Sequence, residues 1–121
     1  MDFLTQDSFK RLLNPGVESV QLLSPHNSAS RRVTITSVTV APGAEQPRHQ
    51  HEASEQIWIA VSGNGTLLLQ DMSTRSFEQG QVVRFEDADV HGFKNTGEVP
   101  FLYISVTAPP INFAYAYESE A

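Results

Sequence analysis

Residues 42–63 of this 121-residue chain read PGAEQPRHQHEASEQIWIAVSG, and this segment carries the strongest structural signal. It contains His49 and His51, which are separated by one residue. Because side chains alternate across a β-strand with a period of two, histidines at this spacing point to the same face. Two imidazoles on one face can bind one metal ion. The segment therefore predicts half of a metal site.

The residues on either side predict short β-strands separated by turns. Pro42-Gly43 marks one turn, and Gly63-Asn64-Gly65 predicts a hairpin between two strands. The predicted strands are rich in β-branched residues and lie at residues 17–23, 33–40, 56–61, 66–70, 77–85 (broken at Gly80), 92–95 and 101–107. Many short strands at close spacing are typical of an all-β antiparallel sandwich or barrel.

The two ends of the chain are expected to add small elements to a single domain. Asp7 or Ser8 can cap a short N-terminal helix at about 5–14, which Asn14-Pro15-Gly16 ends. The C-terminal segment 111–117 places large apolar groups at every second position, which predicts a tail strand. The chain contains no linker, repeat or low-complexity tract. Residues 1–121 are therefore interpreted as one domain, with its barrel at about 17–108.

Composition excludes several classes of function. The chain has no cysteine, so disulfides, thiolate ligands and cysteine nucleophiles are excluded. Fourteen acidic residues against eight basic ones give a formal net charge of −6, which disfavours nucleic acid as a partner. No apolar run approaches the roughly 20 residues of a membrane helix, and the N-terminus lacks the pattern of a signal peptide. We expect a cytoplasmic protein that binds neither nucleic acid nor membranes.

Counting from the glycines extends the histidine pair into two motifs. Gly43 is followed by five residues, His49, one residue and His51, with Gly63 further on. Gly80 is followed by ten residues, His91, three residues and Asn95. This pattern resembles the two motifs of the cupin superfamily, small single-domain cupins among them. The resemblance implies a double-stranded β-helix, the jelly-roll barrel of cupins, with a metal site inside the barrel near one mouth.

The resemblance implies a ligand set of three histidines and one further residue. His49, His51 and His91 fall on the family's histidine positions, and Asn95 falls on a turn or hydrogen-bonding position. The usual glutamate position holds Gln56, whereas the shorter gap between the motif positions would make Glu55 the ligand. Counting back from Gly63 favours Gln56, because a one-residue slip turns every side chain to the other face of the strand.

Two further departures from the family pattern occur in the second motif. Glu86 stands where the family has proline, and Ala88 stands where it has glycine. Both are turn positions. We therefore expect a slightly altered loop and no loss of function.

Three imidazoles and a carbonyl oxygen suit a divalent transition metal such as Fe, Mn, Ni, Co, Cu or Zn. All four ligands are neutral, so the ion would keep its full +2 charge, whereas a glutamate would reduce it. We therefore expect weaker metal retention and a preference for small anionic ligands. The resemblance implies an enzyme of isomerase, lyase, hydrolase or dioxygenase type. The alternative is a non-catalytic ligand-binding or sensing module, because fold does not fix function.

Three aromatic residues are candidates for the pocket. Trp58 shares the parity of Gln56 and Phe93 that of His91, so each is either pocket wall or core. Tyr103 is the candidate catalytic proton donor, with a plain barrel position as the alternative. His26 lies outside both motifs and is interpreted as a solvated loop residue.

The strand 57–61 is apolar on both faces, although one face of a small barrel is normally exposed to solvent. The N-terminal segment, the tail at 111–117 or a second subunit must cover the outer face. We predict a homodimer.

Overall fold

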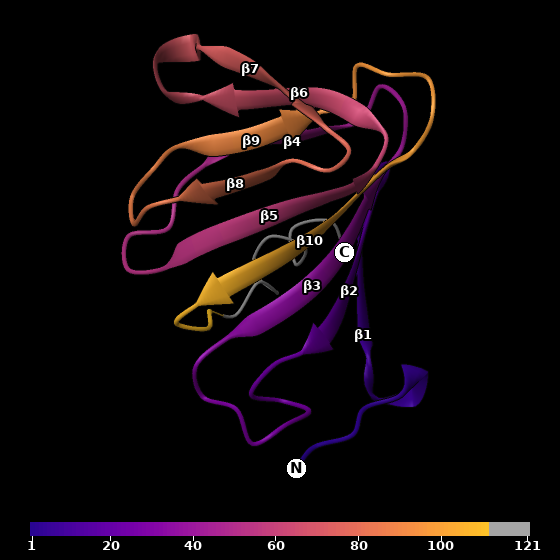
Figure 1. The fold of residues 1–121 in the computed structure, drawn as a ribbon, viewed down its shortest axis with the longest axis vertical. Coiled ribbons are helices and arrows are strands. Elements are labelled where there is room, and N and C mark those ends of the chain that lie inside the picture. Colours follow the sequence, from indigo (N-terminus) through magenta and orange to yellow (C-terminus); the bar gives the residue numbers. More distant parts are fainter. Residues whose placement is uncertain (112–121) are drawn as a thin grey trace.

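Two antiparallel sheets face each other in the computed structural model of the protein, which describes residues 1–111 (Figure 1). The larger sheet has the order β1-β2-β3-β10-β5-β8 and the smaller one the order β4-β9-β6-β7. The strands of the larger sheet are Lys10–Asn14 (β1), Val17–Leu23 (β2), Thr34–Val40 (β3), Phe101–Ala108 (β10), Glu55–Ser62 (β5) and Val82–Phe85 (β8). Those of the smaller sheet are Glu45–His49 (β4), His91–Lys94 (β9), Asn64–Leu69 (β6) and Thr74–Glu78 (β7). This arrangement confirms the predicted double-stranded β-helix.

The inner face of the larger sheet changes from apolar to polar along its strands. On β3, two buried threonines precede Val38 and Val40, and on the antiparallel strand β10 two buried aromatic residues precede a serine and a threonine. The register aligns the change, because Val38 pairs with Tyr103 and Thr36 pairs with Ser105. The apolar rows join the core with Phe77, Phe93 and Phe101. One end of the barrel is therefore closed by packing, and the other end is lined by polar groups.

The predicted parity of β5 is confirmed. Gln56, Trp58 and Ala60 are buried, whereas Ile59 and Val61 are exposed on the outer face. Alternation along a strand with one face toward a core accounts for this pattern. The inward position of Gln56 follows from it.

The predicted N-terminal helix at 5–14 is wrong except for one turn. Only Gln6–Ser8 (η1) is helical, as a 3-10 turn, and β1 follows it and pairs with β2. Burial in this segment alternates with the period of two that is typical of a strand, because Leu12 is half-buried whereas Leu13 is exposed. The Pro15-Gly16 turn then joins the two strands, with Gly16 at φ +74°. None of the helices in residues 1–111 is long and apolar enough to cross a membrane.

The predicted hairpin at Gly63-Asn64-Gly65 is also wrong. β5 pairs with β10 and β8, whereas β6 pairs with β7 and β9, so the chain changes sheets at Gly63. Gly63 has φ +91°, and a Cβ there would lie 2.9 Å from the carbonyl oxygen of Pro100. Glycine at this position thus allows the chain to bend from one sheet into the other, and it does not form a two-residue hairpin turn. The predicted tail strand at 111–117 lies outside the described residues, apart from Ile111.

Candidate metal centre

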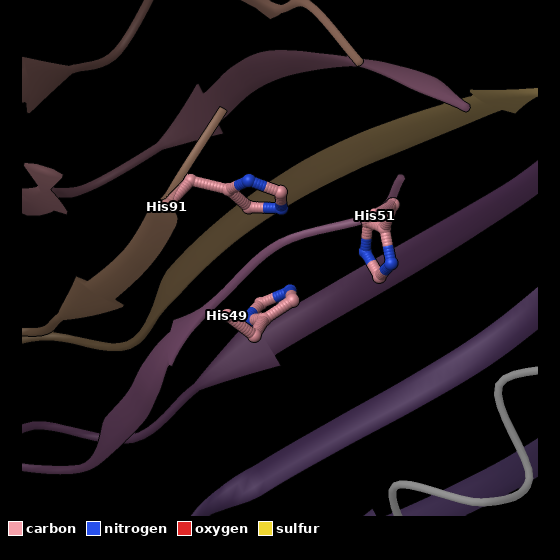
Figure 2. Close-up of side chains that lie close together, drawn as sticks. All are labelled: His49, His51 and His91. Carbon is pink, nitrogen blue, oxygen red and sulfur yellow. The ribbon is translucent and has the colours of Figure 1, made fainter. Parts of the chain in front are cut away.

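Three histidines from two separate segments of the chain converge inside the barrel (Figure 2). Their ligand atoms all lie within 4.8 Å of one another. The ring centroids are 5.0 Å apart for His49 and His51, and 4.3 Å apart for His49 and His91. His49 and His91 are direct partners in the pairing of β4 with β9. His51 lies two residues beyond the end of β4, ahead of the turn at 52–53.

Backbone carbonyls set the orientation of two of these rings. His49 Nδ1 lies 2.9 Å from the carbonyl oxygen of Pro47, and His91 Nδ1 lies 3.0 Å from that of Asp89. A carbonyl can only accept, so Nδ1 carries the proton in both rings and Nε2 keeps its lone pair. His91 Nε2 is buried and makes no hydrogen bond to any described residue. A buried acceptor without a partner is the donor atom that a metal ion requires.

Burial keeps two of the rings neutral near pH 7. Desolvation, and secondly the charge of neighbouring His49, lowers the pKa of His51 from 6.5 to about 4. Desolvation, and again the charge of His49, lowers the pKa of His91 from 6.5 to about 4. Burial disfavours the charged imidazolium, so both rings are ready to act as neutral ligands.

One turn holds both buried histidines in place. The backbone N–H of Ala88 donates to the carbonyl oxygen of His51 at 2.7 Å, and Asp89 accepts from His91. The turn is closed by hydrogen bonds between Glu86 and Asp89. Ala88 has φ +69°, a left-handed conformation that glycine adopts at less cost. The alanine thus keeps the backbone conformation that the family's glycine provides.

Gly92→Ala is predicted to damage the centre through the backbone. A Cβ at Gly92 would lie 2.7 Å from the carbonyl oxygen of Gln46 and 3.0 Å from the backbone N of Arg48. Because these atoms belong to β4, the strand that carries His49 must move away from β9. We expect a loss of about 1–3 kcal/mol in the free energy of unfolding and weaker metal binding. Chemical denaturation and a metal titration measure the two effects.

Gly97→Ala is the matched control, because its Cβ would meet the flexible side chain of Asn64 first. It should leave metal affinity unchanged. Gly92→Ala protein with unaltered metal affinity would contradict the proposed role of the close strand approach.

Gln56 is buried beside the cluster and held on both sides of its amide. Its Nε2 donates to Thr107 Oγ1 at 3.0 Å, and its Oε1 accepts from Trp58 Nε1 at 3.0 Å. The indole N–H is a donor only, so the carbonyl oxygen must face it. That oxygen keeps a second lone pair. Glu55 lies on the outer face, where it forms an ion pair with Arg84 at 3.1 Å.

The other predicted residues fall into two groups. Trp58 and Tyr103 stack at 4.3 Å and line a cavity, and the Tyr103 hydroxyl donates to Gln46 Oε1 at 2.9 Å. Phe93 needs correction as a pocket residue, because it is fully buried against Phe101 and does not line that cavity. The reason is that Phe93 belongs to the apolar core, which fills the closed end of the barrel.

Two further polar residues lie outside the cavity. Asn95 Nδ2 donates to the carbonyl oxygens of Val40 and Val99, so Asn95 is a structural clamp, as expected for a hydrogen-bonding position. His26 is exposed in the loop after β2, which agrees with its interpretation as a solvated residue.

The cavity next to the histidines has a volume of about 490 Å³, within the roughly 300–1,000 Å³ of small-molecule sites. His49, His51 and Gln56 contribute to one side. Gln21, Thr36 and Ser105, which were not predicted, also line it. The inward position of Thr36 could have been found from the alternation of β3, whose buried positions change from threonine to valine along the strand.

The three histidines at the polar end of the small β-barrel are positioned to bind a metal ion. The sequence profile of the cupin domain family matches residues 36–107, which is more than half of the chain. The chain belongs to the cupin family.

Known relatives agree with this assignment. Auxin-binding protein 1 of Arabidopsis thaliana is 29% identical over 126 residues, which cover 95% of this chain and 60% of that protein. The chain therefore spans about 60% of the length of this relative. KdgF from Halomonas sp. has a similar structure, with 22% identity, a TM-score of 0.76 and coverage of 91% of this chain and 96% of that chain. The polyketide cyclase RemF from Streptomyces resistomycificus has 19% identity, a TM-score of 0.77 and coverage of 91% and 80%.

Proposed function

We propose that the protein is a metal-dependent cupin enzyme that acts on a small anionic molecule. The observation that carries the proposal is the convergence of three imidazoles, with ligand atoms within 4.8 Å, beside a cavity of about 490 Å³. His49, His51 and His91 hold a divalent transition metal, and Gln56 supplies its carbonyl oxygen as the fourth ligand. The unpartnered, buried Nε2 of His91 supports this assignment.

The chemistry follows from the ligands. A bound divalent metal would supply a Lewis acid that polarises a carbonyl or carboxyl oxygen of the substrate. Trp58 and Tyr103 shape the cavity, and their stacking at 4.3 Å keeps that side rigid. Tyr103 is the candidate proton donor. Its hydroxyl donates a hydrogen bond to Gln46 on β4, and both residues line the cavity.

Metal reconstitution followed by a substrate screen tests this function. Metal-free protein is loaded separately with Fe²⁺, Mn²⁺, Ni²⁺, Co²⁺, Cu²⁺ and Zn²⁺, and each form is assayed with keto acids, sugar acids and catechols. Turnover with at least one metal, lost on chelation and restored by adding that metal, is the expected result. Failure of every metal form to turn over any compound would favour the second candidate.

The second candidate is a ligand-binding module without catalysis. Its support is the small number of acid–base groups: among the described residues that line the cavity, Glu45 is the only carboxylate. A relative whose name describes auxin binding is similar over most of this chain. Saturable ligand binding by metal-loaded protein, with the ligand recovered chemically unchanged, distinguishes this candidate from the enzyme.

Gln56→Glu is predicted to tighten metal retention. A carboxylate at this inward position lowers the net charge of the centre by one, which strengthens its attraction for a divalent cation. The indole N–H of Trp58 can still donate to it, and the Thr107 hydroxyl can turn to donate as well. Competition with a chelator should show at least about tenfold tighter binding.

Glu55→Gln is the control for Gln56→Glu, because it changes charge by the same magnitude on the outer face. Its metal affinity should be unaltered. Equal affinities for Gln56→Glu and the unmodified protein would remove Gln56 from the ligand set.

The outer face of the larger sheet supports a homodimer. Ile59 and Val82 are direct partners across β5 and β8, and they are 40% and 63% exposed. Light scattering at micromolar concentration should give a mass of two chains, and Val82→Lys should reduce it to one, because a buried charge without a partner is costly. Val99→Lys, at an equally exposed loop valine, should leave the dimer intact. A single-chain mass for the unmodified protein would contradict the homodimer.

A further inference from the structure

A row of three uncharged polar residues crosses the cavity wall. Gln21 on β2, Thr36 on β3 and Ser105 on β10 belong to adjacent strands of the larger sheet. Thr36 pairs with Gln21 on one side and with Ser105 on the other. All three line the cavity that the histidines border. We call these three residues the polar row.

The side chains of the polar row have no hydrogen-bond partner among residues 1–111. Gln21, Thr36 and Ser105 are 7%, 8% and 6% exposed, so each is more than nine-tenths buried. None of them makes a side-chain hydrogen bond to another described residue, although nearby Gln56 and Thr107 bond to each other. Buried polar groups are normally hydrogen-bonded, because an unmet donor or acceptor costs free energy. Three in a row, all facing one cavity, indicate a surface built to hydrogen-bond a ligand.

Among the described residues that line the cavity, Arg48 is the only side chain with a permanent positive charge, and backbone carbonyls hold it in place. Arg48 lines the cavity, but its guanidinium donates to the carbonyl oxygens of Leu69 and Ser73 at 2.7 and 3.2 Å. Glu45 also lines the cavity and would repel an anion. Leu12 and Val17 add apolar surface that suits C–H groups. The metal centre is therefore the stronger site for negative charge on a ligand.

We propose that the polar row selects a small monocarboxylate that carries neutral hydroxyl groups along its chain. Its carboxylate lies at the histidine cluster, and its hydroxyl groups exchange hydrogen bonds with Gln21, Thr36 and Ser105. This inference rests on the proposed metal centre and specifies the class of molecule that it serves. Dicarboxylates and purely aliphatic acids are disfavoured, the former by charge and the latter by leaving the polar row without partners.

Three six-carbon acids test the selection by calorimetric titration of zinc-loaded protein. Gluconate carries one carboxylate and five hydroxyl groups, hexanoate carries one carboxylate alone, and glucarate carries two carboxylates. Gluconate is expected to bind at least about tenfold more tightly than hexanoate, because each hydrogen bond contributes roughly a 3- to 10-fold factor. It should also bind more tightly than glucarate. Hexanoate or glucarate binding as tightly as gluconate overturns the inference.

Substitutions in the polar row separate recognition from folding. Thr36→Val keeps the shape of the side chain and removes its hydroxyl, so gluconate affinity should fall roughly 3- to 10-fold. Hexanoate affinity should stay the same or rise. Thr39→Val makes the identical change on the outer face of the same strand and should alter neither affinity. A Thr36→Val protein that weakens both acids equally, or neither, contradicts a specific role for the row.

Zinc uptake is measured before any acid is added, so the two possible failures can be told apart. A protein that takes up no zinc overturns the proposed function and this inference together. A protein that holds zinc but does not discriminate between the acids overturns this inference alone.

Discussion

Replacing His91 by alanine is expected to abolish stable metal binding. His91 is buried, its Nδ1 donates to the carbonyl oxygen of Asp89, and its Nε2 has no hydrogen-bond partner among the described residues. Loss of a group that merely supports a metal ligand costs roughly 10–100-fold in affinity. Loss of a ligand itself should exceed that. Elemental analysis after reconstitution should fall from one ion per chain to nearly none.

Two comparisons keep this result interpretable. His26→Ala removes an exposed histidine far from the cluster in sequence and should retain full metal content. His91→Leu keeps most of the buried volume and supplies no ligand atom, which limits the cost of a cavity next to Phe85, whose ring stacks on His91 at 4.3 Å. Saturating metal should raise the melting temperature of the unmodified protein and leave that of both His91 variants unchanged. Full metal content in His91→Ala would remove His91 from the centre.

Acidification is expected to destabilise the metal-free protein strongly between pH 6.5 and 4. Folding lowers the pKa of both His51 and His91 from 6.5 to about 4, mainly by burial. In this window the unfolded chain binds protons that the native chain does not, so the free energy of unfolding falls as the pH falls. Above about pH 7 these two rings are neutral in both states and contribute no slope. The loss reaches about 3 kcal/mol for each ring at the acid end.

Urea denaturation across this pH range measures the effect. A double variant, His51→Gln with His91→Gln, should lose most of the slope, because it lacks the two rings that titrate. The difference between the two proteins isolates the histidines from the carboxylates, which are common to both. Parallel stability curves for the two proteins would show that the buried rings do not couple to folding.

The metal centre could be predicted from the sequence because its signal is local. The two histidines of one segment and the glycine spacing around His91 require only counting along the chain. The inward position of Gln56 followed from strand parity, and the burial of Trp58 and the exposure of Ile59 agree with it. Even so, His51 lies beyond the end of β4, so the alternation of one regular strand does not by itself place it in the cluster.

The sequence-based predictions of secondary structure are wrong where pairing between distant strands determines the structure. The segment at Lys10–Asn14 carries capping residues that suggest a helix, but its pairing with β2 makes it a strand. Gly63 resembles a hairpin turn in sequence, yet partners more than twenty residues away place β5 and β6 in different sheets. The polar row escaped prediction for the same reason, since its members come from three strands.

The polar row also has a consequence for the evolution of thermal stability. Hydroxyl and amide groups that face the cavity, with no hydrogen-bond partner in the part of the chain that the structure describes, make the empty protein less stable than apolar replacements of the same shape would. Selection for heat resistance alone is therefore expected to replace Thr36, Ser105 and Gln21 with valine, alanine and leucine. Such a lineage would gain a tighter barrel and lose its ligand, which is a trade-off between stability and activity.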